Sequence, residues 1–282
     1  MNNLAVVGSP IAHSKSPVLH MAAYRVLGLD WSYTKNEVAQ GNLGSFIKSL
    51  DHSWRGLSIT MPLKQEAFEL AATKDAHAEY TGAVNTLAFS HQRSVTAAHG
   101  YNTDVFGITE SMRSAGIDGC THAAIIGGGA TALSALVALS ELGCTEVSVA
   151  LRSIAKGEDL LALGTRLGVN VNIVDLASLD AIKTVDAAIS TVPGSADVSL
   201  DALCKSPQSL LLDVAYDVWP SPRSSQWSAS GGVAISGLSM LANQALKQVR
   251  IFVSDVPDSP LPGESEIRAA MYASVGLNAR GL

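Results

Sequence analysis

Near the middle of the chain runs Ile125-Ile126-Gly127-Gly128-Gly129-Ala130-Thr131-Ala132, the stretch that decides the fold. The apolar run 123–126 before the glycines predicts a strand, and the small-residue stretch 132–142 after them predicts a helix. Glycines in such a turn let the backbone approach a pyrophosphate, and the following helix N-terminus offers unpaired N–H groups. The sequence therefore predicts a Rossmann-type dinucleotide-binding domain that begins well inside the chain.

The second apolar run of this expected domain, 147–151, ends at Arg152. A site for NAD usually has Asp or Glu at this point to accept the ribose 2′-hydroxyl, and neither Leu151 nor Arg152 can do so. A guanidinium suits a 2′-phosphate instead, and Ser153 and Lys156 would add donors. These residues predict NADP as the cofactor. The alternatives are glycines that serve packing alone and an ordinary exposed arginine at a strand end.

Length and order of elements predict an α/β chain of two domains, because 282 residues are near the upper limit for one core. The first domain is expected to have a mostly parallel sheet, and the boundary falls at 116–121. Expected before the boundary are strands at 4–8, 31–38 and 56–61, helices at 16–27, 43–50 and 103–115, and strands 83–89 and 94–98 around a turn at 90–93. Expected after it are strands at 169–174, 187–191 and 210–214, helices at 159–167, 238–252 and 264–272, and a loop at 219–225.

Composition excludes several functional classes. The net charge is −6, and Lys and Arg are scattered, which argues against a nucleic-acid surface. No apolar run reaches the roughly 18 residues that cross a bilayer, and the N-terminus shows no secretory signal, so we expect a cytoplasmic protein without a membrane partner. Cys120, Cys144 and Cys204 have no metal-type spacing, so we expect free thiols and no metal site.

Polar residues of the first half follow the expected strands. They are Ser14 and Ser16, the segment 58–64, Asn85, and the segment 100–104. Ligands gather at the carboxyl ends of strands in an open sheet, so these segments could converge on one small molecule. Each also has a structural explanation: helix caps for the serines, turns for Asn85 and Asn102, a first-turn acid for Asp104, and a surface charge for Lys64.

Taken together and in this order, the segments resemble the shikimate dehydrogenase family over nearly the whole chain. The similar segments are 8–20, 60–64, 83–86, 100–104, 190–193, 213–216 and 237–244. The resemblance implies that the chain crosses back after residue 237. We therefore expect a substrate-binding and catalytic domain of residues 1–115 with 238–282, and an NADP-binding Rossmann domain of residues 116–237.

The family activity implied is the reversible, NADP-dependent reduction of 3-dehydroshikimate to shikimate, in the chorismate pathway of aromatic amino acid biosynthesis. Lys64 would sit beside Asp104 and assist proton transfer. The residues implied for substrate binding are Ser14, Ser16, Thr60, Asn85, Asn102, Tyr216 and Gln244. Those implied for the cofactor are Gly127, Gly128, Gly129, Ala130, Thr131, Arg152, Ser153, Lys156, Thr191, Val192, Pro193, Gly237 and Met240.

Three departures from the family pattern accompany this resemblance. Ser58 stands where the family usually has Asn, the turn 127–131 differs at two small positions, and 151–153 reads Leu-Arg-Ser in place of Asn-Arg-Thr. The rival hypotheses are a quinate/shikimate dehydrogenase that uses NAD and a catalytically silent paralogue that binds a metabolite. The expected partner is the small-molecule substrate, and a monomer or a homodimer is equally compatible with the sequence.

Overall fold

The computed structural model describes residues 2–92, 95–182, 184–203, 208–254 and 257–282. The chain forms two compact units, one of residues 1–103 with 241–279 and one of residues 104–240 with 280–282. The α/β class expected from the sequence is confirmed. The domain boundaries expected after residues 115 and 237 stay predictions. Each unit is described by itself.

The first unit is built on a six-stranded sheet of order β2-β1-β3-β5-β6-β4 in the described residues. Pairing is parallel among β1, β2 and β3 and between β4 and β6, and antiparallel where β5 joins β3 and β6. The strands are β1 (Asn2–Gly8), β2 (Trp31–Glu37), β3 (Trp54–Ile59), β4 (Thr73–Lys74), β5 (Thr86–Gln92) and β6 (Val95–Tyr101). The helices are α1 (Ser16–Val26), α2 (Leu43–Lys48), α3 (Lys64–Leu70), α4 (Ala76–Thr81), most of α9 (Gly237–Val253) and α10 (Glu264–Ser274).

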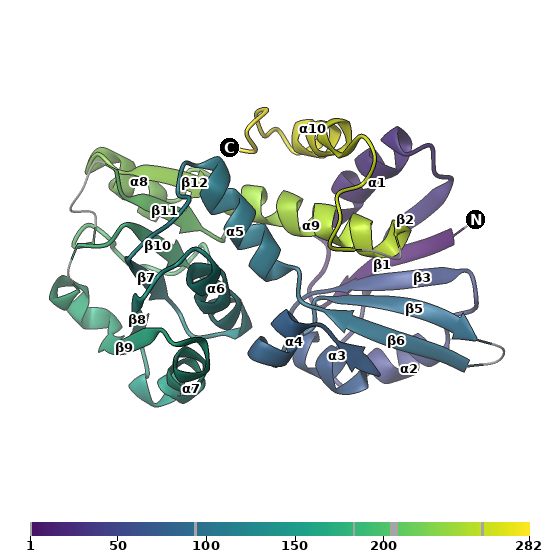
Figure 1. Ribbon diagram of the computed structural model, residues 1–282, viewed down its shortest axis with the longest axis horizontal. Helices are drawn as coiled ribbons and strands as arrows, with labels where there is room; N and C mark the ends of the chain where they lie inside the picture. Colours follow the sequence, from purple (N-terminus) through teal and green to yellow (C-terminus); the bar gives the residue numbers. More distant parts are fainter. Residues whose placement is uncertain (1, 93–94, 183, 204–207, 255–256) are drawn as a thin grey trace. The chain divides into compact units, whose positions relative to one another are not determined.

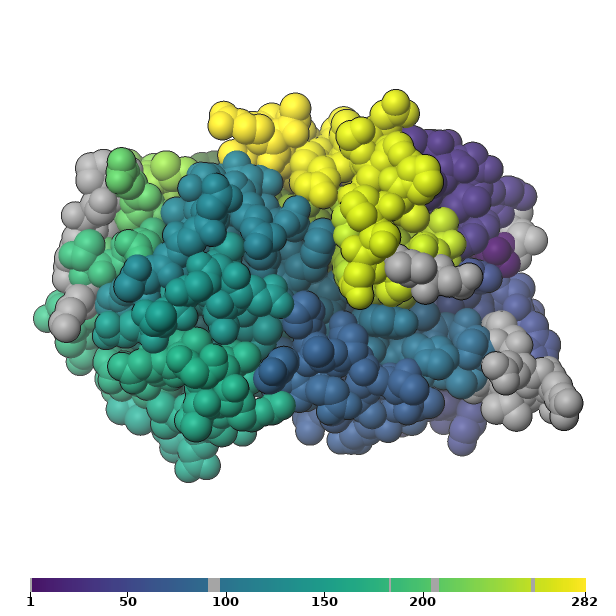
Figure 2. Space-filling view, in the orientation of Figure 1, coloured from purple at the N-terminus to yellow at the C-terminus, as the bar shows by residue number. Residues whose placement is uncertain are grey.

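The two faces of this sheet have different chemistry. Helices α2, α3 and α4 cover one face and α1, α9 and α10 the other (Figure 1). Successive side chains of a strand point to opposite faces, so Leu57 of β3 joins the apolar core with Leu43 of α2 and Ala67 of α3. The next residue, Ser58, bonds to residues of β2 and α9 instead. On that second face α1 packs against α10, and their purple and yellow surfaces meet in Figure 2.

Most expected elements of this unit are found at the expected places. Helix α1 begins at Ser16 with Pro17 in its first turn, and Gly28 takes a positive φ just after its end. The short elements α3, β4 and α4 were not predicted, because runs of two to seven residues carry too little periodicity. The turn expected at 90–93 is wrong for residues 90–92, which continue β5, while residues 93 and 94 lie outside the described residues.

The second unit has a sheet of order β12-β11-β10-β7-β8-β9, with every pairing among its described strands parallel. When the strands are numbered from β7 in chain order and the sheet is read from β9, their order in the sheet is that of a doubly wound dinucleotide-binding fold. The strands are β7 (His122–Ile126), β8 (Glu146–Leu151), β9 (Asn170–Asp175), β10 (Ala187–Ser190), β11 (Leu210–Asp213) and β12 (Val233–Ser236). The helices are α5 (Asp104–Ser114), α6 (Ala130–Glu141), η1 (Ile154–Gly157), α7 (Glu158–Leu167), η2 (Leu176–Ala181) and α8 (Pro222–Ala229).

One expectation in this unit is wrong. The segment 219–225 reads as a loop because of its Ser and Pro, but residues 222–225 open helix α8. The Ser221 hydroxyl accepts a hydrogen bond from the Ser224 N–H and caps this helix, and Pro222 occupies its first turn. Two of the residues that suggested a loop are therefore a helix start signal. Strand β12 was also not predicted.

No helix in the described ranges of the chain has both the length and the apolarity needed to span a membrane. Cys120 and Cys144 are buried free thiols, while Cys204 lies outside the described residues.

His20 of α1 is buried between this helix and the second face of the first sheet. His20 stacks on Tyr33 with ring centroids 4.0 Å apart, and its Nδ1 lies 3.1 Å from the Tyr24 hydroxyl. Its Nε2 lies 3.1 Å from Gln248 Oε1, which can only accept, so Nε2 carries the proton and Nδ1 accepts from Tyr24. Burial lowers the pKa of His20 from 6.5 to about 3, and the imidazole is neutral in the folded chain.

This burial predicts a pH-dependent stability. Between pH of about 3 and 6.5 the unfolded chain binds a proton at residue 20 that the folded chain does not, so the free energy of unfolding rises with pH in this window. Within the window the free energy of unfolding rises by up to about 1.4 kcal/mol per pH unit, and above it the contribution of His20 is constant. We expect His20→Gln to flatten the slope measured by urea denaturation from about pH 7.5 to about pH 4.5. His13→Gln, at an exposed position, is the control; an unchanged slope in His20→Gln would contradict the buried neutral imidazole.

Candidate functional site

The glycine turn of the second unit forms one wall of a pocket of about 550 Å³. Gly127 has φ of +108°, and a Cβ there would collide with the Thr191 hydroxyl. A Cβ at Gly128 would lie 2.7 Å from Leu151 Cδ2, whereas Gly129 has open space around it. Gly127 is therefore required by its positive φ and by the close approach of the loop after β10, whereas a side chain at residue 128 would need the end of the Leu151 side chain to move. The third leaves room at the start of α6, where the first N–H groups of a helix have no partner within it.

Hydrogen bonds hold the turn between its neighbouring strands. The Gly127 N–H donates to the Ala150 carbonyl at 3.0 Å. The Thr191 N–H and hydroxyl both donate to the Ile126 carbonyl, at 2.8 and 3.0 Å. Strands β7 and β10 are neighbours at which the strand order reverses, and doubly wound folds bind ligands at this point.

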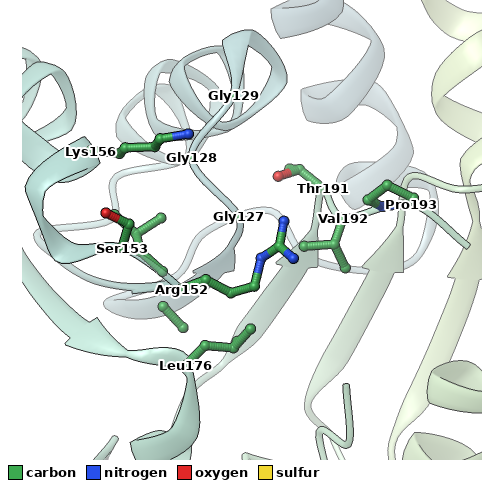
Figure 3. Close-up of a pocket in the computed structure, with 12 residues that line it drawn as sticks. Gly127, Gly128, Gly129, Arg152, Ser153, Lys156, Leu176, Thr191, Val192 and Pro193 are labelled. Carbon is green, nitrogen blue, oxygen red and sulfur yellow. The ribbon is translucent and has the colours of Figure 1, made fainter. Parts of the chain in front are cut away.

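Two cations border the pocket. Figure 3 shows the Arg152 guanidinium pointing toward Gly127 and the Lys156 ammonium pointing toward the glycine turn. Both side chains are exposed, so they can move to meet a ligand. Arg152 also borders a second cavity of about 380 Å³, where Asp175 and Asp197 carry the opposite charge. The first pocket, with a glycine turn, a helix start and two cations, is therefore the one suited to an anion.

Most of the cofactor residues expected from the sequence line this pocket together. They are Gly127, Gly128, Gly129, Arg152, Ser153, Lys156, Thr191, Val192 and Pro193. Among the described residues, Ala130 and Thr131 open α6, and Gly237 and Met240 lie at the start of α9, outside the lining. Ala150, Leu151 and Leu176 line the pocket and were not predicted. Leu176 directly follows β9, the strand beside β8. Its position at this strand end is the feature of the sequence that could have predicted its place in the pocket.

Arg223 supports the far wall of this pocket and was not predicted either. Its guanidinium donates to the carbonyls of Ala196 and Pro193 at 2.9 and 3.3 Å, and to Asp213 Oδ1 at 3.2 Å. The side chains of this ion pair are 2% and 0% exposed, and Ser221 donates to the other Asp213 oxygen. The pair thereby fixes the loop that begins at Pro193.

Several polar residues singled out in the first unit make hydrogen bonds with one another or with neighbouring residues. The Asn85 amide nitrogen donates to Thr103 Oγ1 at 2.9 Å and to Gln244 Oε1 at 2.8 Å. The Asn102 amide donates to Thr81, and the Ser14 hydroxyl accepts from the Ser16 N–H at the start of α1. Ile59 donates its N–H to the Asn85 carbonyl, which ties the end of β3, just before Thr60, to the same place.

Lys64 begins α3, and its carbonyl accepts a hydrogen bond from the Val84 N–H at 3.0 Å. This bond holds the backbone of residue 64 beside the segment that leads to Asn85. A helix N-terminus does not stabilise an ammonium, so local helix stability gives no reason for a lysine here. Asp104, the first residue of α5, is buried, and Tyr216 follows β11. Both belong to the second unit, so their roles toward Lys64 stay predictions.

Comparisons with known proteins point to one family. A family model described as "Shikimate dehydrogenase substrate binding domain" matches residues 6–87. The chain is 33% identical to the shikimate dehydrogenase (NADP(+)) of Dinoroseobacter shibae over 85% of this chain and 87% of that protein.

Two further comparisons extend this. The chain is 32% identical to the pentafunctional AROM polypeptide of Yarrowia lipolytica over 93% of this chain, but it spans only 17% of that protein's length. The crystal structure of Mycobacterium tuberculosis shikimate dehydrogenase superposes with a TM-score of 0.85 at 35% identity, covering 98% of this chain and 99% of that one.

The buried ion pair of the second unit yields a stability prediction. Arg223→Met leaves the Asp213 carboxylate buried without its cation, and we expect the free energy of unfolding to fall by about 3 kcal/mol. Arg268→Met is the matched control, because Arg268 is 29% exposed and 3.6 Å from Glu264, and we expect a loss below about 1 kcal/mol. Chemical denaturation measures both. Equal small losses would show that the pair does not stabilise the loop after β10.

Proposed function

The chain belongs to the shikimate dehydrogenase family, and from this premise we propose that it reversibly reduces 3-dehydroshikimate to shikimate with NADPH, a step of aromatic amino acid biosynthesis. The observation that carries the proposal is the pocket in which a glycine turn, the start of α6, Arg152 and Lys156 come together. A neutral ligand would gain little electrostatic stabilisation from the helix start and the two cations. A dinucleotide with a pyrophosphate and a further phosphate would interact with the glycine turn, the helix start and both cations.

The residues present fit NADP. Three successive glycines leave the turn as bare backbone, with open space around Gly129, so a pyrophosphate can approach the backbone closely. Arg152 presents a planar donor set to a phosphate, and Ser153 and Lys156 can add donors from the same rim. In this reading Thr191, Val192 and Pro193 bind the nicotinamide half, and Ala130, Thr131, Gly237 and Met240 complete the site.

The proposed chemistry of the chain itself is proton transfer and charge stabilisation. Bound NADPH supplies a hydride to the ketone carbon. The ketone oxygen gains negative charge as the hydride arrives, and the Lys64 ammonium stabilises this charge and provides the proton. Asp104 orients the ammonium. In the reverse direction the same groups take the proton from the hydroxyl of shikimate.

The remaining polar residues recognise the substrate. We propose that Ser14, Ser16 and Thr60 bind the carboxylate. Asn85, Asn102, Tyr216 and Gln244 would bind the hydroxyls. Among them, the half-exposed Gln244 accepts a hydrogen bond from Asn85 through its Oε1 and can donate from its amide nitrogen to a substrate hydroxyl. We also propose that the protein acts in the cytoplasm as a monomer or a homodimer, which size-exclusion chromatography with light scattering would decide.

The rivals are separated by one set of assays. Oxidation of shikimate and of quinate is measured with NADP⁺ and with NAD⁺. We expect turnover with shikimate and NADP⁺ to dominate. Dominant turnover of quinate with NAD⁺ would favour the quinate/shikimate enzyme, and tight binding of shikimate without any turnover would favour a silent paralogue.

The role of Lys64 predicts a kinetic defect. Lys64→Ala removes the proton donor, so we expect kcat for shikimate oxidation to fall by about two orders of magnitude or more, with a much smaller change in shikimate affinity. Lys48→Ala, at the exposed end of α2, is the matched control and should retain wild-type kcat. Near-normal turnover by Lys64→Ala would refute the role.

The role of Arg152 predicts a change in cofactor preference. Arg152→Ala removes the proposed partner of the 2′-phosphate, so we expect the KM for NADPH to rise by roughly tenfold or more and the KM for NADH to change little. Arg166→Ala, on the exposed side of α7, controls for loss of a positive charge in the same unit. A parallel rise of both KM values would show that no 2′-phosphate is bound there.

A further inference from the structure

Gln248 is a buried amide that uses its whole hydrogen-bonding capacity. Its Oε1 accepts from the Ser58 hydroxyl at 2.8 Å and from His20 Nε2 at 3.1 Å. Its Nε2 donates to Thr86 Oγ1 at 3.0 Å and to the Asn85 carbonyl at 3.3 Å. A side-chain amide offers two acceptor positions and two N–H groups, so all four are used, and the residue is only 3% exposed.

The four bonds join segments that are far apart in the sequence. His20 lies one turn after Ser16 on α1, and Ser58 lies two residues before Thr60 at the end of β3. Asn85 directly precedes β5, which begins at Thr86, and Gln248 itself lies one turn after Gln244 on α9. Each of these segments carries one residue proposed to bind the substrate. Gln248 therefore connects them from the buried side.

Two further hydrogen bonds extend the network on either side of Gln248. The Tyr33 hydroxyl donates to Ser58 Oγ at 2.6 Å, and Ser58 donates onward to Gln248. On the other side the Thr86 hydroxyl donates to Asn85 Oδ1 at 2.8 Å.

Asn85 is thereby fixed in one amide orientation. Its Oδ1 also accepts from the Thr103 N–H and hydroxyl, at 2.9 and 3.1 Å. The amide nitrogen donates to Thr103 Oγ1 at 2.9 Å and to Gln244 Oε1 at 2.8 Å. A rotated amide would put its nitrogen against the Thr103 N–H, which can only donate, and would lose this bond.

Ser58 has a specific function in this network. A serine hydroxyl both accepts from Tyr33 and donates to Gln248 within one short side chain. The departure noted in the sequence is therefore part of a connected set with Tyr33 and Gln248.

We propose that Gln248, with Ser58 and Tyr33, is a positioning residue for substrate binding, which holds the Asn85 amide in the orientation that a hydroxylated substrate requires. The inference rests on the proposed function, because it assigns the orientation of a residue proposed to bind shikimate. Gln248 and Tyr33 act through their neighbours and do not touch the substrate.

The test compares variants that remove hydrogen bonds while keeping shape. Gln248→Met and Tyr33→Phe are measured for shikimate affinity by calorimetry and for shikimate and NADP⁺ kinetics. We expect the Kd and KM for shikimate to rise about tenfold, which is the effect of losing an oriented polar contact, with the KM for NADP⁺ within about twofold of wild type. Tyr272→Phe is the matched control, because Tyr272 donates to Asn243 of the same helix at 2.7 Å and is equally buried.

Two results would overturn the inference. If Gln248→Met and Tyr33→Phe lower the melting temperature as Tyr272→Phe does but leave shikimate affinity unchanged, the network serves stability alone. If Gln248→Met does not fold, Tyr33→Phe, which removes a single oxygen, decides on its own. Wild-type protein that neither binds nor oxidises shikimate would refute the proposed function and this inference with it, whereas active wild type with unaffected variants refutes the inference alone.

Discussion

The close approach of β7 to the loop after β10 is the constraint on which the pocket at the glycine turn depends. Two donors of Thr191 converge on the Ile126 carbonyl, and this leaves no room for a side chain at residue 127. Because the turn passes so near Thr191, α6 starts where the strand order of the sheet reverses. Arg152, which follows the end of β8, lines the same pocket. One steric condition thus places the backbone donors and the cations on the same pocket.

The elements that could be predicted have signals within a few residues of one another. The strand, glycines and helix at 123–142 are contiguous, and α1 has its proline in the first turn and a glycine after its end. Arg152 could be singled out because it ends the strand that follows this unit of sequence. The pocket brings most of the residues expected for the cofactor together, since all of them stand at strand ends of one parallel sheet. Their individual roles stay predictions.

The parts that could not be predicted depend on partners far apart in the sequence. Arg223 reads as a loop residue until the fold places it against Asp213 and two carbonyls of another loop. Gln248 reads as one polar position on an amphipathic helix, and its partners at 20, 58 and 86 belong to three other elements. No local pattern specifies such sets, because hydrogen-bond satisfaction of a buried polar group is a property of the packed chain. Ser58 shows the same limit, since its significance depends on Tyr33 and Gln248.

The two candidate sites use polar groups in different ways, and the difference follows from what each would bind. Phosphates are recognised by charge and by backbone N–H groups, so exposed cations that can move are sufficient at the rim of the pocket at the glycine turn. A ligand with several hydroxyls is distinguished from its analogues only where donors and acceptors are fixed and would be left unpaired by the wrong molecule. Burying an amide, an imidazole and hydroxyls together has a free-energy cost unless every bond is made, and apolar residues of similar size would pack without that requirement. A fully satisfied polar network behind Asn85 is therefore explained better by a need for fixed orientation than by stability.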